Sequence, residues 1–159
     1  MKTPEMNGVY KPHQTYAKEI MKYHAKSFYF AGKFLPAERR SATYAIYSFC
    51  RYADNIVDNP RQRKQEEILH ELYELRRELE NACNYGESEN PAVGAYIASA
   101  KVYGIPAKYV LDLLKGVEMD LTINRYDNFD DLYLFCYRVA GVVGLMMTYV
   151  LGFEDEEAL

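Results

Sequence analysis

The chain has 159 residues, of which 49% are hydrophobic and 26% charged, a composition typical of a globular domain with a core of its own. A net charge of −4 argues against nucleic acid as a partner, because nucleic-acid-binding domains usually carry a basic surface. The first residues are polar and show no apolar signal segment, so we expect one domain over residues 1–159 and a cytoplasmic location.

The spacing of apolar residues predicts six helices and no strand. The expected elements, in chain order, are helices over about residues 14–34, 35–59, 61–85, 91–103 and 106–125 and a last helix that follows the loop at 126–128. Pro36, Pro91 and Pro106 lie where a helix can begin, because a proline in the first turn removes no helical hydrogen bond. The acidic cluster from Asp127 to Asp131 suits the capping of the last helix better than metal binding.

Two of these helices show a clear apolar stripe for packing. The expected core positions are Ile68, Leu72, Leu75, Leu79 and Ala82 in the third helix and Val110, Leu113, Leu114, Val117 and Leu121 in the fifth. The pattern therefore predicts an all-α bundle, an architecture that builds ligand sites between helices.

The last helix is the most apolar segment. Residues 132–153 carry a single charge, Arg138, and include Gly141 and Gly144. The uninterrupted apolar part, from 139 to 153, is shorter than the roughly 20 residues that span a membrane. We therefore expect a central core helix in place of a membrane span. Cys50 and Cys136 lie in apolar helical stretches and are expected to be reduced core residues.

Asp54 and Asp58 give the strongest chemical signal. They lie four residues apart on a predicted helix, and Arg51 lies one turn earlier on the same face. Mg²⁺ uses one or two carboxylates and takes its other ligands from phosphate oxygens and water, and arginine binds diphosphate through charge-assisted hydrogen bonds. The alternative is a solvated acidic face. The flanking residues are largely apolar, however, and carboxylates on a buried helix need partners.

The sequence resembles the squalene/phytoene synthase family of head-to-head prenyl synthases in several motifs. The resemblance runs from about His24 to Gly152 and rests on HAKSFYF at 24–30, LPAERR at 35–40, the aspartate pair, MDL at 119–121, RY at 125–126 and CYRVAGVVGLM at 136–146. The last motif is more similar to bacterial phytoene and dehydrosqualene synthases than to the eukaryotic squalene enzyme.

The resemblance implies an isoprenoid-synthase-like helical fold and a prenyltransferase of carotenoid or isoprenoid biosynthesis. Two prenyl diphosphates would be joined head to head, through a cyclopropyl diphosphate, to a polyene such as phytoene or dehydrosqualene. Mg²⁺ is the implied cofactor, and no NADPH is expected for these products. The residues implied by motif match are Tyr47, Arg51, Asp54 and Asp58 for catalysis, Asp54 and Asp58 for the metal, and His24, Ser27, Phe28, Asp120, Arg125, Phe135, Val139 and Gly144 for substrate binding.

Two departures from the family pattern affect this interpretation. Asn55 replaces a second consecutive aspartate, which leaves the spaced pair intact, and Phe135 replaces a tyrosine implicated in proton handling. The proton step would then fall to the diphosphate, Tyr133 or Tyr137.

Family members continue well beyond Gly152 and supply a second acidic motif, so the bundle is expected to be truncated. An incompletely covered cavity exposes apolar surface, so we expect self-association. A hydrophobic polyene product predicts peripheral membrane contact. Two alternatives remain: a different Mg²⁺-dependent isoprenoid synthase or terpene cyclase, and a non-catalytic helical fragment that needs a missing C-terminal half.

Overall fold

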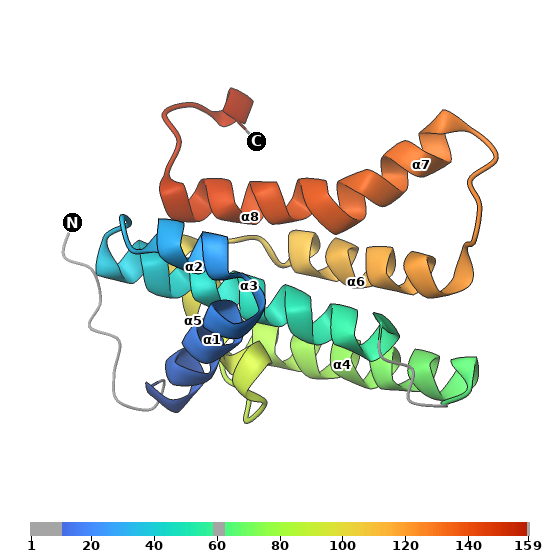
Figure 1. The fold of residues 1–159 in the computed structure, drawn as a ribbon, viewed down its shortest axis with the longest axis horizontal. Helices are drawn as coiled ribbons and strands as arrows, with labels where there is room; N and C mark the ends of the chain where they lie inside the picture. Colours follow the sequence, from blue (N-terminus) through green and yellow to red (C-terminus); the bar gives the residue numbers. More distant parts are fainter. Residues whose placement is uncertain (1–10, 59–62, 159) are drawn as a thin grey trace.

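The structure is a computed structural model that describes residues 11–58 and 63–158, and in these ranges every regular element is helical (Figure 1). The elements are α1 (Lys11–His24), α2 (Lys26–Gly32), α3 (Ala37–Asp58), α4 (Gln65–Tyr85), α5 (Pro91–Tyr103), α6 (Ala107–Thr122), α7 (Phe129–Cys136), the π-helical turn η2 (Tyr137–Gly141), α8 (Val142–Leu151) and the 3₁₀ turn η3 (Glu156–Ala158). The predicted all-α fold is therefore confirmed. The predicted boundary at Asn59-Pro60 and the predicted helix start at Arg61 lie outside the described residues.

The helix ends follow the expected local chemistry. Pro91 occupies the first turn of α5, and the Asn90 side chain accepts hydrogen bonds from the backbone N–H groups of Ala92 and Val93. Asn128 caps α7 in the same way through the N–H of Asp131, at 2.9 Å. Of the two predicted capping residues, Asp127 and Asn128, the structure uses Asn128, and Asp130 and Asp131 lie in the first turn of α7 as expected.

The centre of the bundle is α3, which packs against α1, α5, α6, α8 and α4. Its buried residues include Ile46, Phe49, Ala53 and Ile56, and the Phe49 ring lies 5.2 Å from the ring of Tyr96 on α5. The stripes predicted for the third and fifth helices are buried as expected, with Leu121 only half-buried. This packing fixes α3 and therefore the direction of the polar groups on its remaining face.

The N-terminal segment differs from its prediction. A single helix over residues 14–34 is wrong, because the chain leaves helical geometry at Ala25, with φ −133° and ψ 62°. Ala25 is buried against Ala17, Met21 and the Ala45 region of α3, whereas Phe30 is 61% exposed. No proline or glycine marks this break, so local sequence carries no signal for it.

The last helix also differs from its prediction. Figure 1 shows α7 and α8 along the outer edge of the bundle, beside α6. The segment Phe129–Leu151 is long and apolar enough to cross a membrane, with mean hydropathy 1.7, but only 17% of its apolar window is buried. A central core helix is therefore wrong for this chain: Val142, Met146 and Val150 are buried, and most other side chains are not.

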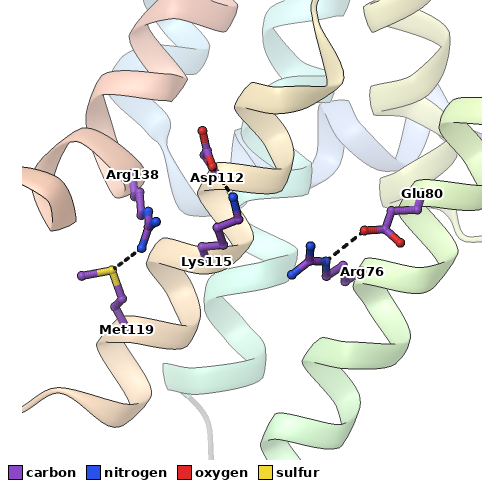
Figure 2. A network of polar contacts seen from close by, with 6 residues as sticks. All are labelled: Arg76, Glu80, Asp112, Lys115, Met119 and Arg138. Carbon is purple, nitrogen blue, oxygen red and sulfur yellow. Dashed lines mark hydrogen bonds and ion pairs between the residues drawn. The ribbon is translucent and has the colours of Figure 1, made fainter.

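The one charged side chain between residues 132 and 151, Arg138, contacts α6. Arg138 Nη1 donates to Met119 Sδ at 3.1 Å, as Figure 2 shows beside the ion pairs Asp112–Lys115 on α6 and Arg76–Glu80 on α4. Gly116 makes this approach close, since a Cβ there would lie 2.8 Å from the Arg138 Cβ. The π-helical turn therefore packs backbone to backbone on α6.

The three cysteines are free thiols, as expected, but only Cys50 is partly buried. Burial raises the pKa of the Cys50 thiol to about 12, so it stays protonated. Cys136 is exposed on α7, so its assignment to the core is wrong.

Candidate active site

The predicted catalytic residues occupy one face of α3, the face that its packing leaves free. Arg51 and Asp54 are half-buried and Asp58 is exposed at the C-terminal end of the helix. The Arg51 Nη1 atom lies 3.6 Å from the Asp58 Oδ2 atom, so the arginine and the second aspartate already form an ion pair. The i,i+4 spacing thus produces the shared face that the sequence predicted.

Asp54 has the most perturbed carboxyl group of the face. Burial, helped by the charges of Asp58 and Asp120, raises its pKa to about 6, and Arg51 opposes the shift. Asp120 belongs to α6, so α3 and α6 direct carboxylates toward the same region. Negative charges gathered in this way favour a cation between them.

Arg51 presents a donor without a partner. Its Nε atom is enclosed and makes no hydrogen bond with the described residues. The side chain also lines a cavity of about 450 Å³ together with His24, Asn55 and Arg63. Arg63 is engaged by Glu71 and by the Ile56 carbonyl oxygen, 2.8 Å away. An enclosed guanidinium N–H beside a cavity is a suitable donor for an anionic oxygen.

The donor set fits Mg²⁺ only together with a phosphate ligand. Among residues 11–58 and 63–158, no group of three or more His, Cys, Asp or Glu side chains lies close enough to hold a metal ion. Asp54 and Asp58 can supply the one or two carboxylates that Mg²⁺ needs, with diphosphate oxygens and water for the rest. The face therefore suits a metal–diphosphate pair better than a metal alone.

Tyr47 lies one turn before Arg51 on the same helix. Its pKa is raised, first by burial, and it interacts electrostatically with Arg51 and Asp54. Tyr47 thus belongs to the same polar face and has a neutral hydroxyl that can donate a hydrogen bond.

Tyr126 is a residue of this region to which motif reasoning assigned no role. Its hydroxyl is enclosed without a hydrogen-bond partner among the described residues, and burial followed by the Asp120 charge raises its pKa. Its ring lies 5.3 Å from the ring of Phe135, the position where the usual tyrosine is replaced. The signal available in sequence was the Arg125-Tyr126 motif itself, but the contact with Phe135 depends on the packing of α6 against α7.

The remaining predicted residues are less closely gathered. His24, Ser27 and Phe28 are exposed at the junction of α1 and α2, and only His24 shares a cavity with Arg51. Arg125 is exposed after α6. Val139 is half-buried opposite Gly116, and Gly144 is exposed on α8 with nothing within 4 Å of where its Cβ would be.

Comparison with known proteins decides which family this arrangement represents. The model of the squalene/phytoene synthase family matches residues 21–159. The chain belongs to the squalene/phytoene synthase family. The matched range contains every residue assigned above to the candidate site.

Curated relatives from bacteria and plants agree with this membership. The chain is similar to a 15-cis-phytoene synthase of Synechococcus elongatus, 37% identical over 87% of this chain and 44% of the relative. A phytoene synthase of Pseudescherichia vulneris is 38% identical over 91% of this chain and 48% of the relative. A chloroplastic phytoene synthase of Arabidopsis thaliana is 37% identical over 87% of this chain and 32% of the relative. The chain thus spans about half, or less, of these relatives.

Solved structures share the fold. A dehydrosqualene synthase in complex with a ligand superposes with a TM-score of 0.79 at 29% identity, over 89% of this chain and 48% of that chain. Squalene synthase HpnC from Alicyclobacillus acidocaldarius gives a TM-score of 0.81 at 23% identity, over 94% of this chain and 55% of that chain. The bundle is therefore the isoprenoid-synthase-like helical fold that the sequence predicted.

Proposed function

We propose that this chain forms part of the active site of a prenyltransferase that joins two prenyl diphosphates head to head. The reaction would pass through a cyclopropyl diphosphate to a thirty- or forty-carbon polyene such as dehydrosqualene or phytoene, in carotenoid or isoprenoid biosynthesis. Membership of the family and the phytoene synthases among the curated relatives support this proposal.

The observation that carries the proposal is the pairing of a carboxylate face with an unpartnered guanidinium donor. The carboxylates of Asp54 and Asp58 would hold Mg²⁺, with the Asp120 charge nearby. The enclosed Nε of Arg51 would donate to a diphosphate oxygen and stabilise the charge that develops as the diphosphate departs. Mg²⁺ bound there would act as a Lewis acid on the leaving diphosphate.

The other residues would position the substrate and exclude water. Tyr47 would donate a hydrogen bond beside Arg51, and Phe28 and Val139 would cover the hydrocarbon chain. The Tyr126 hydroxyl, near Asp120, would hold a proton that the Phe135 ring cannot. We place His24, Ser27, Arg125 and Gly144 at the periphery of the same substrate site.

The environment of the protein is part of the proposal. Mg²⁺ is the cofactor, NADPH is not expected, and the substrate is a prenyl diphosphate. A cytoplasmic protein with peripheral membrane contact or self-association would bury the exposed apolar side chains of α7 and α8, which include Phe129, 73% exposed, and Tyr133, 63% exposed.

Calorimetric titration with a non-hydrolysable geranylgeranyl diphosphate analogue tests the site directly. We expect Mg²⁺ to strengthen binding, and we expect this Mg²⁺-dependent part of the binding to be lost in the Asp54→Asn/Asp58→Asn double variant. The charge-matched control is Glu87→Gln/Glu89→Gln, two exposed acids in the loop between α4 and α5, which should bind as the wild type does. Mg²⁺-dependent binding that survives the loss of both aspartates, or a folded wild type that shows no Mg²⁺-dependent binding, would refute the assignment.

A further inference from the structure

A cavity of about 720 Å³ lies between α1, α2 and the start of α3, and its chemistry differs from that of the candidate active site. Its charged lining residues are all cations, namely Lys11, Lys18, Lys33 and Arg40. None of its lining residues is Asp or Glu, although the chain as a whole carries a net charge of −4. Four positive charges around one cavity repel one another, and an anion bound between them would offset this repulsion.

These cations are free of acidic partners. Among the described residues, none of the four forms an ion pair, whereas Lys22, one turn after Lys18 on α1, pairs with Glu19. Lys33 lies over the Tyr29 ring, 5.3 Å from its centroid. Arg40 makes only a long contact, 3.5 Å, to the Lys33 carbonyl oxygen. Their charges therefore remain available to a ligand.

Hydrogen bonds between helices hold the lining of the cavity in place. The Ser41 hydroxyl donates to Gln14 Oε1 at 2.5 Å and joins α3 to α1, and the Tyr44 hydroxyl donates to the Tyr29 carbonyl oxygen at 3.3 Å and joins α3 to α2. Gly32 gives the Tyr44 ring its space, because a Cβ there would lie 3.0 Å from that ring. The lining is thus held by three helices.

One donor in this lining lacks a partner. The Nε2 atom of Gln14 is enclosed and makes no hydrogen bond with the described residues, while the Oε1 atom of the same side chain is occupied by Ser41. An enclosed amide donor without an acceptor is costly unless a ligand or water satisfies it. The unpaired cations require negative charge and the amide requires an acceptor, and an anionic oxygen supplies both.

The cavity is separate from the carboxylate face. Tyr44 precedes Asp54 by ten residues on α3, which corresponds to about 15 Å along the helix axis. None of Tyr47, Arg51, Asp54 or Asp58 lines it. An anion bound here would therefore be a different ligand from the diphosphate at Arg51, and would need no metal.

We propose that the α1–α2–α3 cavity is a metal-independent binding site for a phosphate-bearing ligand, held by Lys11, Lys18, Lys33, Arg40 and the amide of Gln14. Two sources share this chemistry: a soluble phosphate or diphosphate, and the phosphate headgroup of an anionic lipid. This inference does not depend on the proposed catalytic function.

Two binding experiments in EDTA separate the sources. The first is calorimetric titration with inorganic diphosphate. The second is co-sedimentation with phosphatidylcholine vesicles that contain about one fifth phosphatidic acid, compared with pure phosphatidylcholine vesicles. We expect binding in at least one arm, and a decrease as salt is raised. Binding to diphosphate alone identifies a soluble ligand, and binding to the acidic vesicles alone identifies a headgroup.

The deciding variant is Lys18→Ala/Lys33→Ala, which removes two of the four cations. We expect about tenfold weaker binding, because each lost charge acts over a short distance at a partly solvated site. The matched control is Lys101→Ala/Lys108→Ala, also two exposed lysines, of which Lys108 lies over a tyrosine ring as Lys33 does, 4.7 Å from the Tyr109 centroid. The Asp54→Asn/Asp58→Asn variant should bind like the wild type.

Three results would overturn the proposal. The first is absence of binding in both arms, and the second is an equal loss in the two lysine variants, which would indicate only net charge. The third is loss of binding in the double aspartate variant, which would place the ligand at the carboxylate face. Circular dichroism of each variant shows whether the helices are retained, so a folding defect is recognised separately.

Discussion

The raised pKa of Asp54 predicts that this carboxylate destabilises the folded chain at neutral pH. Above about pH 6 the group is ionised in both the folded and the unfolded chain, and the folded chain bears the cost of a charge that is partly buried and faces Asp58 and Asp120. Below about pH 3 it is protonated in both states and the cost disappears. Since the folded chain binds this proton more tightly, the contribution of Asp54 to stability decreases as pH rises between these values.

The Asp54→Asn variant removes this cost. The separation between an ordinary aspartate pKa near 4 and the value of about 6 sets an upper bound of about 3 kcal/mol. Asp54 is only partly buried, and screening by water reduces the expected gain in the free energy of unfolding to about 1 kcal/mol at neutral pH. The gain should decrease as pH falls below about 6 and vanish at about pH 3, below both pKa values, where aspartic acid and asparagine are both neutral.

Urea denaturation of both proteins at several pH values measures this difference. Asp58→Asn is the control: its carboxylate is 51% exposed and ion-paired with Arg51, so we expect it to gain less at neutral pH. A gain of equal size at all pH values, or a loss of stability at neutral pH, would refute the electrostatic argument. Addition of Mg²⁺ at a constant concentration of inorganic diphosphate should stabilise the wild type and leave Asp54→Asn nearly unchanged.

Two further predictions concern packing and capping. Gly116→Ala should lower the free energy of unfolding by about 1–3 kcal/mol, because the new Cβ meets the π-helical turn; Gly144→Ala, where no atom lies within 4 Å, should instead be neutral or stabilising in thermal denaturation. Equal effects at the two glycines would contradict the described contact of α6 with η2. Asn90→Ala should cost about 1 kcal/mol in urea denaturation, since it removes the α5 cap and the hydrogen bond to the Tyr52 hydroxyl at 3.2 Å. Asn128→Ala, a cap on the exposed helix α7, should cost less, and a reversed order would show that burial of the capped helix does not set the cost.

The sequence predicted those features that depend on spacing along one helix. The stripe from Ile68 to Ala82 is buried because apolar residues that recur every three or four positions share a face. Asp54 and Asp58 share a face for the same reason. Local signals also placed the start of α5 at Pro91 and the cap of α7 within residues 127–131, where Asn128 bonds to a backbone N–H three residues away, whereas the cap at Asn90 was not predicted.

The features that sequence reasoning missed depend on contacts between helices. The break at Ala25 follows from packing against α3 and has no local signal. The basic cavity joins residues of α1, α2 and α3, and the contact between Tyr126 and Phe135 joins the loop after α6 to α7. The exposure of α7 and α8 was missed because hydropathy shows that a helix is apolar but not which of its faces finds a partner.

The π-helical turn at Tyr137–Gly141 has a consequence for the direction of the side chains on either side of it. A π turn holds one residue more than an α turn, so each side chain after it is rotated by about 100° relative to a continuous α-helix. Phe135, before the turn, contacts Tyr126, whereas Val142, Met146 and Val150, after it, are buried in the core. Removal of one residue from the turn would therefore restore regular α-helical hydrogen bonding and leave the side chains of α8 in their present directions. This segment should therefore tolerate the loss of one residue from the turn better than the loss of one residue from α8, which would rotate every side chain after it by about 100°.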